Sequence, residues 1–164
     1  MSHGEERAAL LAALAAQRHH VLGTLDGLPE EDLRRPVLPS GWSCLGLVRH
    51  LALDVERFWF RAVVAGERVD LESGADAWRV DAETPAAAVF DLYRREAELA
   101  DAVIAGTDLD AAPAWWPEEV FPGLPPHALR RTVLHVITET ACHAGHLDAA
   151  RELIDGRAWL VLTD

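Results

Sequence analysis

Four long stretches of the chain repeat their apolar residues with the period of an α-helix, and this pattern limits the possible folds most. The stretches cover about residues 5–25, 43–65, 84–106 and 127–156. No segment shows the sustained apolar–polar alternation of a half-buried β-strand. Four helices of this length in 164 residues predict an all-α protein, a four-helix bundle formed by a single domain over residues 1–164.

Residues at the ends of these stretches support the assignment. Ser43 is a favourable N-cap and Gly66 a favourable stop for the second helix. Thr84 followed by Pro85 predicts an N-cap and a first helical residue for the third helix. Gly156 is expected to end the fourth helix, and residues 30–34 are expected to form one additional turn.

Charge and hydropathy exclude two classes of partner. The net charge is −12, whereas binding to a nucleic-acid backbone needs a basic surface. No apolar run approaches the ~20 residues of a membrane-spanning helix, and the N-terminus does not have the form of a signal peptide. We therefore expect a cytoplasmic protein without a nucleic-acid or membrane partner.

The chain has two cysteines, Cys44 and Cys142, which are too few for a disulfide framework. Cys142 precedes His143 but lies about 100° away around the expected helix. We expect Cys142 to be a small buried apolar residue rather than a nucleophile.

The strongest functional signal is a stripe of metal-binding residue types in the fourth helix. His135, Glu139, His143 and His146 follow one another at spacings of four, four and three residues. On an α-helix these spacings place all four side chains on one face. Imidazole and carboxylate groups that face the same way predict a site for a divalent metal.

A further ligand has to come from another helix, and His50 in the second helix is the candidate. His50, Glu139 and His143 would form a three-ligand set that leaves positions open for water or substrate, as in catalytic zinc sites. Zinc is the first choice, and nickel, iron or manganese would also suit these ligands. His135 lies about 12 Å from His143 along the helix, so His135 and His146 are expected to support the ligands or to face the substrate.

Other polar residues near these positions have less specific patterns. Asp54 and Asp148 are candidates to orient a ligand histidine. Arg49, Arg57 or an arginine of the loops is a candidate to bind a carboxylate or sugar group of a substrate. The remaining histidines have no partner at a ligand spacing and are expected on the surface: His3, His19, His20 and His127.

The connections on either side of the third helix are long and carry Trp78, Trp115, Trp116 and Phe121. Loops usually run over the surface, so this number of aromatic residues needs a structural reason. They could cap the open end of the bundle, line a pocket or form a dimer contact.

Two motifs resemble the DinB/YfiT-like superfamily, and within it the branch similar to the N-terminal domain of mycothiol-dependent maleylpyruvate isomerase. One is Gly41-Trp42-Ser43 followed by His50; the other is Glu139-x-x-x-His143-Ala-Gly-His146. The resemblance implies a bundle of up-down-down-up topology that is often dimeric. It also implies a metal held by the residues at the positions of His50, Glu139 and His143.

Members of this superfamily with known activity are metal-dependent transferases or isomerases that use a small thiol such as mycothiol or bacillithiol. The resemblance therefore predicts a homodimeric, metal-dependent enzyme that activates mycothiol for S-transfer to an electrophilic small molecule. The chain has no second domain of the isomerase kind, so isomerisation of maleylpyruvate is not expected. A non-catalytic metal-binding, structural or sensing bundle is the alternative. Metal-assisted hydrolysis is a weaker one, since it would need a separate base such as His146.

Overall fold

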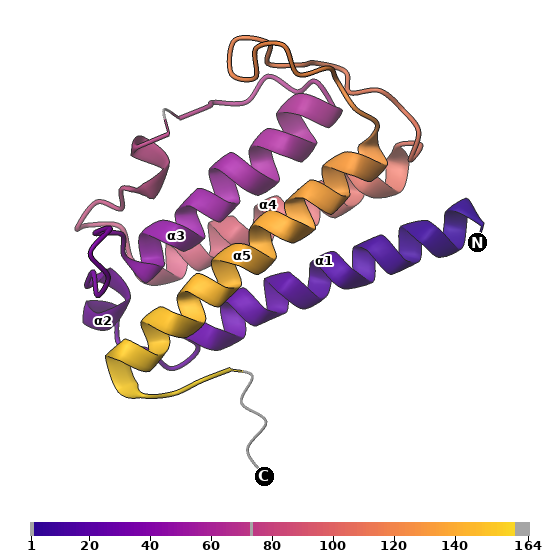
Figure 1. Cartoon of the computed structure of the whole chain (residues 1–164). Helices are drawn as coiled ribbons and strands as arrows, with labels where there is room; N and C mark the ends of the chain where they lie inside the picture. The colour runs from indigo at the N-terminus through magenta and orange to yellow at the C-terminus, as the bar shows by residue number, and fades with distance from the viewer. Residues whose placement is uncertain (1, 73, 160–164) are drawn as a thin grey trace.

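The structure is a computed structural model that describes residues 2–72 and 74–159. The described residues form helices and no strand (Figure 1). In chain order the helices are α1 (His3–Leu25), α2 (Glu30–Arg34), α3 (Cys44–His50), the π-helix η1 (Leu51–Val64), the 3₁₀ turn η2 (Asp76–Trp78), α4 (Ala86–Gly106) and α5 (Leu129–Asp155). No helix in this part of the chain is both long enough and apolar enough to cross a membrane.

The long helices form a bundle of up-down-down-up topology, as predicted (Figure 1). α1 and α5 are parallel, because Glu6 pairs with Arg130 at their starts and Thr24 bonds to Asp148 near their ends. The α3–η1 helix and α4 both run in the opposite direction. Arg7, at the start of α1, therefore donates to the carbonyl of Ile104 at the end of α4.

The second long helix differs from the expected continuous α-helix. Ser43 caps it as predicted, accepting a hydrogen bond from the Gly46 amide at 3.1 Å. The α-form ends at His50, and the next fourteen residues form the wider π-helix η1. Its last turn shows the wider pattern, since the Ala65 amide donates to the Phe60 carbonyl. Apolar periodicity predicts a helix but does not separate these two forms, and π turns often occur at functional sites.

Three further assignments made from sequence can be compared with the structure: one short helix, one helix end and one helix start. Residues 30–34 form the short helix α2, and Gly156 ends α5 in the left-handed conformation at φ 77°, both as predicted. The start of α4 was predicted one residue too early. Pro85 occupies the N-cap position and α4 begins at Ala86, so Thr84 does not cap the helix. The Thr84 carbonyl instead accepts a hydrogen bond from Arg34 of α2.

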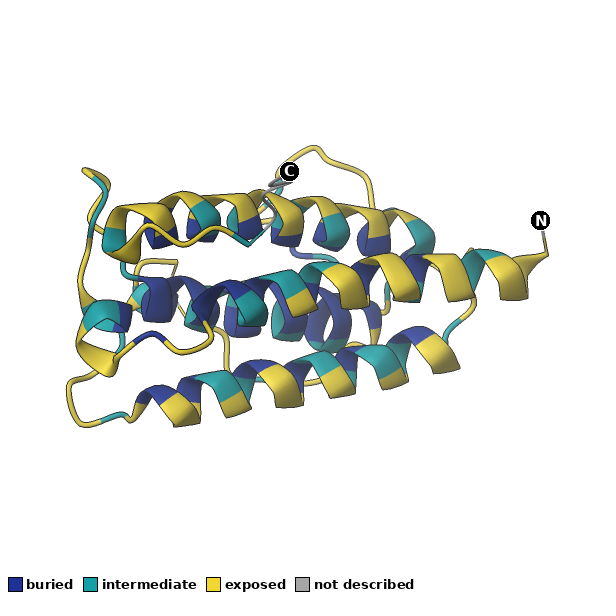
Figure 2. Cartoon of the chain, turned by 90° about the horizontal axis from the view of Figure 1, so that it is seen from below, coloured by how far each residue is buried: buried dark blue, intermediate teal, exposed yellow. Residues whose placement is uncertain are grey.

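The buried residues lie on the inward faces of the four long helices (Figure 2). η1 is buried around most of its circumference and is the most central element of the bundle. A charged cluster also crosses this core. Arg18 of α1 donates to both carboxylate oxygens of Glu56 and to Asp101 of α4, each at 2.7 Å.

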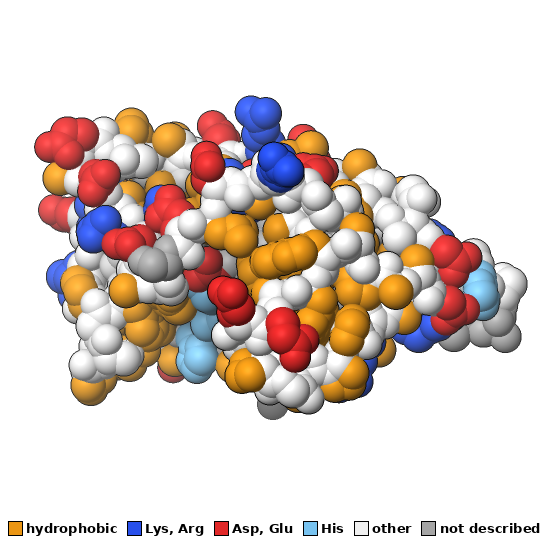
Figure 3. All heavy atoms as spheres, turned by 90° about the horizontal axis from the view of Figure 1, so that it is seen from above, with side chains coloured by type: hydrophobic (Ala, Val, Ile, Leu, Met, Phe, Trp, Pro, Cys, Tyr) orange, Lys and Arg blue, Asp and Glu red, His pale blue; other side chains and the backbone are white. Residues whose placement is uncertain are grey.

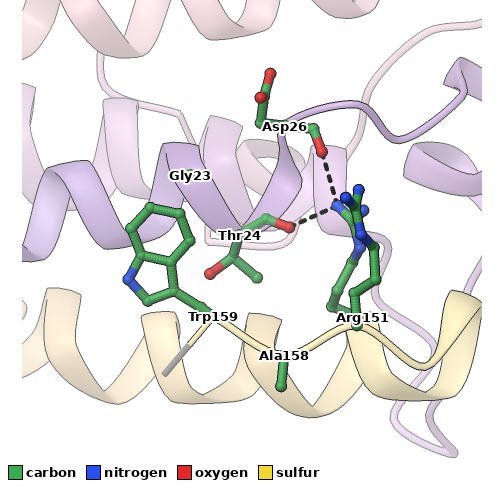
Figure 4. A pocket seen from close by; sticks show the side chains of 7 residues that line it. Gly23, Thr24, Asp26, Arg151, Ala158 and Trp159 are labelled. Atoms are coloured by element: carbon green, nitrogen blue, oxygen red, sulfur yellow. Dashed lines mark hydrogen bonds between the residues drawn. The ribbon is translucent and has the colours of Figure 1, made fainter. Parts of the chain in front are cut away.

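The segment after α5 folds back over α1 (Figure 4). Trp159 packs directly over Gly23, where a Cβ atom would overlap the indole ring. The indole also stacks on His20 at a ring-centre distance of 5.8 Å. Beside it, Arg151 donates to the backbone carbonyls of Thr24 and Asp26, which anchors the end of α5 to the end of α1.

His20 was predicted to lie on the surface, and this prediction was wrong. The side chain is only 15% exposed and its Nε2 is 2.7 Å from Asp148. Asp148 therefore orients His20 and not one of the proposed metal ligands. His19 and His3 are exposed, as predicted.

Candidate metal centre

The structure brings together three of the residues selected from sequence: His50, Glu139 and His143. One ligand atom from each residue lies within 4.8 Å of the others. His50 is the last residue of α3, while Glu139 and His143 are one turn apart on α5. Because the two helices pack against each other in opposite directions, His50 meets residues that are 89 and 93 positions further along the chain.

The geometry of this group fits a metal site. His143 Nε2 and Glu139 Oε1 are 3.2 Å apart. Ligands about 2.0–2.1 Å from a tetrahedral zinc ion lie roughly 3.3 Å from one another. The other ring nitrogen of His143, Nδ1, is buried and has no hydrogen-bond partner among the described residues. Nε2 is therefore the candidate ligand atom, since it is the nitrogen that faces Glu139, and Nδ1 is a buried polar atom of the site that still lacks a partner.

His50 is held in a fixed orientation. Its Nδ1 lies 2.9 Å from Asp54 Oδ2, and its ring stacks on Trp78 at 4.2 Å with 17° between the planes. A hydrogen bond donated by Nδ1–H to a carboxylate fixes the tautomer of a histidine that binds metal through Nε2. Asp54 thus occupies the orienting position considered from sequence, and the loop residue Trp78 supports the same ring.

Burial makes the neutral imidazole the favoured form of His143. Its pKa is lowered first by desolvation and then by the charge of His50, although the nearby Glu139 acts in the opposite direction. Neutral imidazole is the form that coordinates metal ions. The surroundings of His143 therefore prepare it chemically for a ligand role.

The other two histidines of the stripe lie outside the three-residue group. His146 is exposed, with its ring 5.5 Å from that of His143 and 6.3 Å from Trp42. His135 is one helical turn before Glu139 and contacts the indole of Trp59 at 4.7 Å. The structure thus places both of them beside the group, on opposite sides along α5.

The loop aromatics divide between two places. Trp78 packs on His50, whereas Trp116 and Phe121 join Trp59 of η1 in an aromatic cluster. Trp115 is 42% exposed and lies at the edge of this cluster. Figure 3 shows hydrophobic side chains exposed on the face formed by the long loops, with acidic groups around them.

His127 was also predicted to lie on the surface, and this was wrong. It is partly buried between Trp59 and Trp116, with ring centres 6.1 and 5.1 Å away. The prediction failed because the sequence gives no indication that the loop before α5 would place His127 against η1.

Neither arginine suggested for substrate binding is free. Arg49 donates to the Asp76 carbonyl and to Glu72, both at 2.6 Å. Arg57 donates to Glu96, which is itself almost fully buried. Both guanidinium groups therefore stabilise the fold.

The expectation for Cys142 was wrong. Cys142 is exposed and Cys44 is buried, and both are free thiols. Within residues 2–72 and 74–159, Cys142 lies on an exposed side of α5, next to the exposed Ala141. Burial raises the pKa of Cys44 to about 11, so its thiol is unreactive near neutral pH.

A second group of potential ligands, His3, Asp108 and Asp110, lies near the start of α1. All three are exposed, and Asp110 pairs with Arg130. Exposed acidic groups of this kind are common on protein surfaces, and this group has no buried or unpaired ligand atom.

These features define the chain as an up-down-down-up four-helix bundle with a candidate His–Glu–His metal centre between its second and fourth long helices. The family model described as mycothiol-S-transferase matches residues 9–156. The chain therefore belongs to the mycothiol-S-transferase family, a DinB/YfiT-like family whose chemistry is thiol S-transfer. No match was found among curated proteins or among solved structures.

Proposed function

We propose that the protein is a metal-dependent S-transferase that activates a small thiol, mycothiol, for attack on an electrophilic small molecule. The observation that carries this proposal is the convergence of His50, Glu139 and His143, with ligand atoms within 4.8 Å, in a chain of the mycothiol-S-transferase family.

The ligand set favours a catalytic rather than a structural metal. Structural zinc sites are closed by four protein ligands, whereas three ligands leave a position for water or substrate. The two nitrogen donors and one oxygen donor suit zinc first, and also nickel, iron or manganese. Glu139 and His143 lie on one rigid helix, and the hydrogen bond to Asp54 fixes His50, so the three donors are already in place.

The proposed reaction needs a thiolate beside an electrophilic carbon. When bound, the metal lowers the pKa of a coordinated thiol and so supplies the thiolate at neutral pH. The thiol proton is released, the sulfur forms a bond to the carbon, and the electron pair displaced from that carbon leaves with its substituent. Trp78 and Asp54 hold His50 during this step, and the exposed His146 lies beside His143, with ring centres 5.5 Å apart.

The first test is metal content, measured by mass spectrometry on untagged protein reconstituted with zinc. Wild type is expected to hold about one metal ion per chain, and His143→Ala to hold none while remaining helical by circular dichroism. His135→Ala is the matched control and should keep the metal. Stoichiometric metal in His143→Ala, or complete loss in His135→Ala, would contradict the ligand assignment.

The second test separates an enzyme from a metal-binding bundle without catalysis. Loaded wild type should transfer mycothiol to a chromogenic aryl halide, and His143→Ala should not. Full metal loading without transfer to any of a panel of electrophiles would favour the structural or sensing alternative. A homodimer, expected from the family resemblance, should appear by light scattering at micromolar concentration.

A further inference from the structure

A cavity of about 210 Å³ lies between η1, the loop before α5 and α5 itself, apart from the three proposed ligands. Its wall contains three aromatic side chains, two histidines and one arginine: Trp59, Trp116, Phe121, His127, His135 and Arg131. Leu124 and Pro125 complete it. None of these residues has a role in the ligand set, so the cavity needs an explanation of its own.

The rings around the cavity are arranged to receive a flat molecule. Trp59 is nearly parallel to Phe121, with centres 5.4 Å apart and 16° between the planes. The ring of His127 is also nearly parallel to Trp59, at 23°. Trp116 meets His127 edge-on, and His135 meets Trp59 edge-on. Trp116 is tilted to Trp59 and Phe121, by 52° and 41°. An aromatic ligand gains from both stacked and edge-to-face contacts in such a setting.

Arg131 gives the cavity a positive charge at its rim. Most arginines of this chain are tied to a carboxylate or a carbonyl, including its neighbour Arg130. No hydrogen bond or ion pair to the Arg131 side chain is found within residues 2–72 and 74–159. An exposed, unpaired guanidinium in a chain of net charge −12 is available to an anion from outside.

The half-buried His127 adds no competing charge. Burial and then the charge of Arg131 lower the pKa of His127, which favours the neutral ring. His127 Nδ1 lies 3.3 Å from the Thr132 hydroxyl, so this nitrogen has a partner within the protein. The cavity is therefore largely apolar, with one fixed positive charge at its edge.

The cavity is also close to the candidate metal centre. His135 forms part of its wall and precedes Glu139 by four residues on α5, which is roughly 6 Å along the helix axis. The wall of the cavity and the nearest proposed ligand, Glu139, are therefore about one helical turn apart.

We propose that this cavity binds the electrophilic substrate, and that this substrate is a small planar aromatic compound carrying a carboxylate. The aromatic ring lies among Trp59, Trp116 and Phe121, and the carboxylate pairs with Arg131. An apolar cavity of about 150 Å³ is enough to hold benzene, so the present cavity accepts one substituted ring. A sugar-bearing thiol would need many hydrogen bonds, which these mostly apolar walls do not supply. The assignment as a substrate site rests on the proposed function.

Binding can be tested without catalysis or metal by isothermal titration calorimetry with trans-cinnamate, a planar acid that reacts poorly with thiols. Its neutral counterpart trans-cinnamamide is the second probe. Arg131→Gln should weaken cinnamate about tenfold, as expected for one charge-assisted contact, and leave cinnamamide unchanged. Arg95→Gln removes another exposed arginine, on α4, and should change neither. Equal cinnamate affinity in wild type and Arg131→Gln would overturn the proposal.

A pair of neighbouring tryptophans tests the aromatic wall. Trp116→Leu removes a wall residue and should weaken both probes, whereas Trp115→Leu changes an exposed tryptophan outside the cavity and should weaken neither. Both variants are in a loop, so circular dichroism should show an intact bundle. Equal effects of the two variants, or no cinnamate binding by wild type, would contradict the assigned cavity.

Kinetics then separates this proposal from the proposed function. For an aryl halide with a carboxylate, Arg131→Gln should raise KM with little change in kcat or metal content, and the neutral aryl halide should be unaffected. An equal fall in kcat for both halides would overturn the substrate-site assignment. If wild type has neither metal nor transferase activity but binds cinnamate through Arg131, the proposed function fails and only the binding site stands.

Discussion

Two groups of ionisable side chains lie between the helices. They differ in how completely the protein supplies them with hydrogen-bond and ion-pair partners. Arg18, Glu56 and Asp101 form one group between α1, η1 and α4. Glu56 is fully buried, and Arg18 donates to both of its oxygens at 2.7 Å. Each charge in this group has a partner within the protein, so it is a structural group.

The second group, His50, Glu139 and His143, is only partly satisfied: His143 Nε2 lies 3.2 Å from Glu139, and His50 Nδ1 lies 2.9 Å from Asp54. Its members are partly exposed, and His143 Nδ1 is buried without a hydrogen-bond partner among the described residues. The comparison shows that buried polar groups alone do not identify a functional site. Polar groups that converge on one place and leave room for a ligand define a candidate site, and the predictions below test this difference.

The largest effect on stability is expected from removing a member of the Arg18, Glu56 and Asp101 group. Glu56→Ala should lower the free energy of unfolding by about 3–5 kcal/mol, because it leaves Arg18 buried without its main partner. Urea denaturation followed by circular dichroism measures this. Glu98→Ala removes an exposed carboxylate from α4 and should change the free energy by less than about 0.5 kcal/mol. A loss below about 1 kcal/mol in Glu56→Ala would show that the ion pair is not structural.

Asp54→Ala should weaken metal binding by about 10–100-fold, because it removes the hydrogen bond that orients His50. Competition with a chromogenic chelator measures the affinity. Asp148→Ala is a matched control, since Asp148 makes the same kind of contact with His20, at 2.7 Å, away from the candidate centre. Equal affinity in wild type and Asp54→Ala would mean that His50 needs no orienting group.

The two cysteine thiols should differ in reactivity because Cys142 is exposed and Cys44 is buried. Cys142 should react with a maleimide at pH 7.5, whereas buried Cys44 should react at least about 100-fold more slowly because its pKa is raised to about 11. Peptide mass spectrometry on the folded protein identifies the labelled residue, and both should react in urea. Comparable labelling of both thiols in the folded protein would contradict the burial of Cys44.

The smallest effect is expected from Gly23→Ala, at the packed end of α1. The new methyl group would displace the Trp159 indole, while alanine favours the helix by up to about 1 kcal/mol. The two effects oppose each other, so the free energy of unfolding should change by less than about 1 kcal/mol. Tryptophan fluorescence should nevertheless change. An unchanged spectrum would show that Trp159 does not pack over Gly23.

The long helices and most of their ends were accessible from sequence because the signals are local. Apolar residues at helical spacing, Ser43 as a cap and Gly156 as a stop depend on neighbours within a few residues. The predictions of side-chain exposure were wrong where a segment distant in the sequence covers the residue. His20 and His127 were predicted to be exposed, but the segment after α5 and the aromatic cluster on η1 cover them.

The candidate site shows the same division. The stripe on α5 was predictable because spacings of three and four residues place side chains on one face. That His50 reaches this stripe was a hypothesis until the packing of α3 against α5 placed ligand atoms from both within 4.8 Å. No pattern in the sequence could indicate that Trp59 and Arg131 share a cavity, since they are 72 positions apart.

The sequence by itself thus determined the helices, the all-α class and the residue types available for metal binding, because these follow from local spacing. Only the tertiary structure decided which polar groups are satisfied and which remain available. Arg18 is buried and His143 is partly buried, both on amphipathic helices, and their local sequences do not distinguish their roles. The difference arises from what the other helices place beside them, namely two carboxylates beside Arg18 and an open ligand set beside His143.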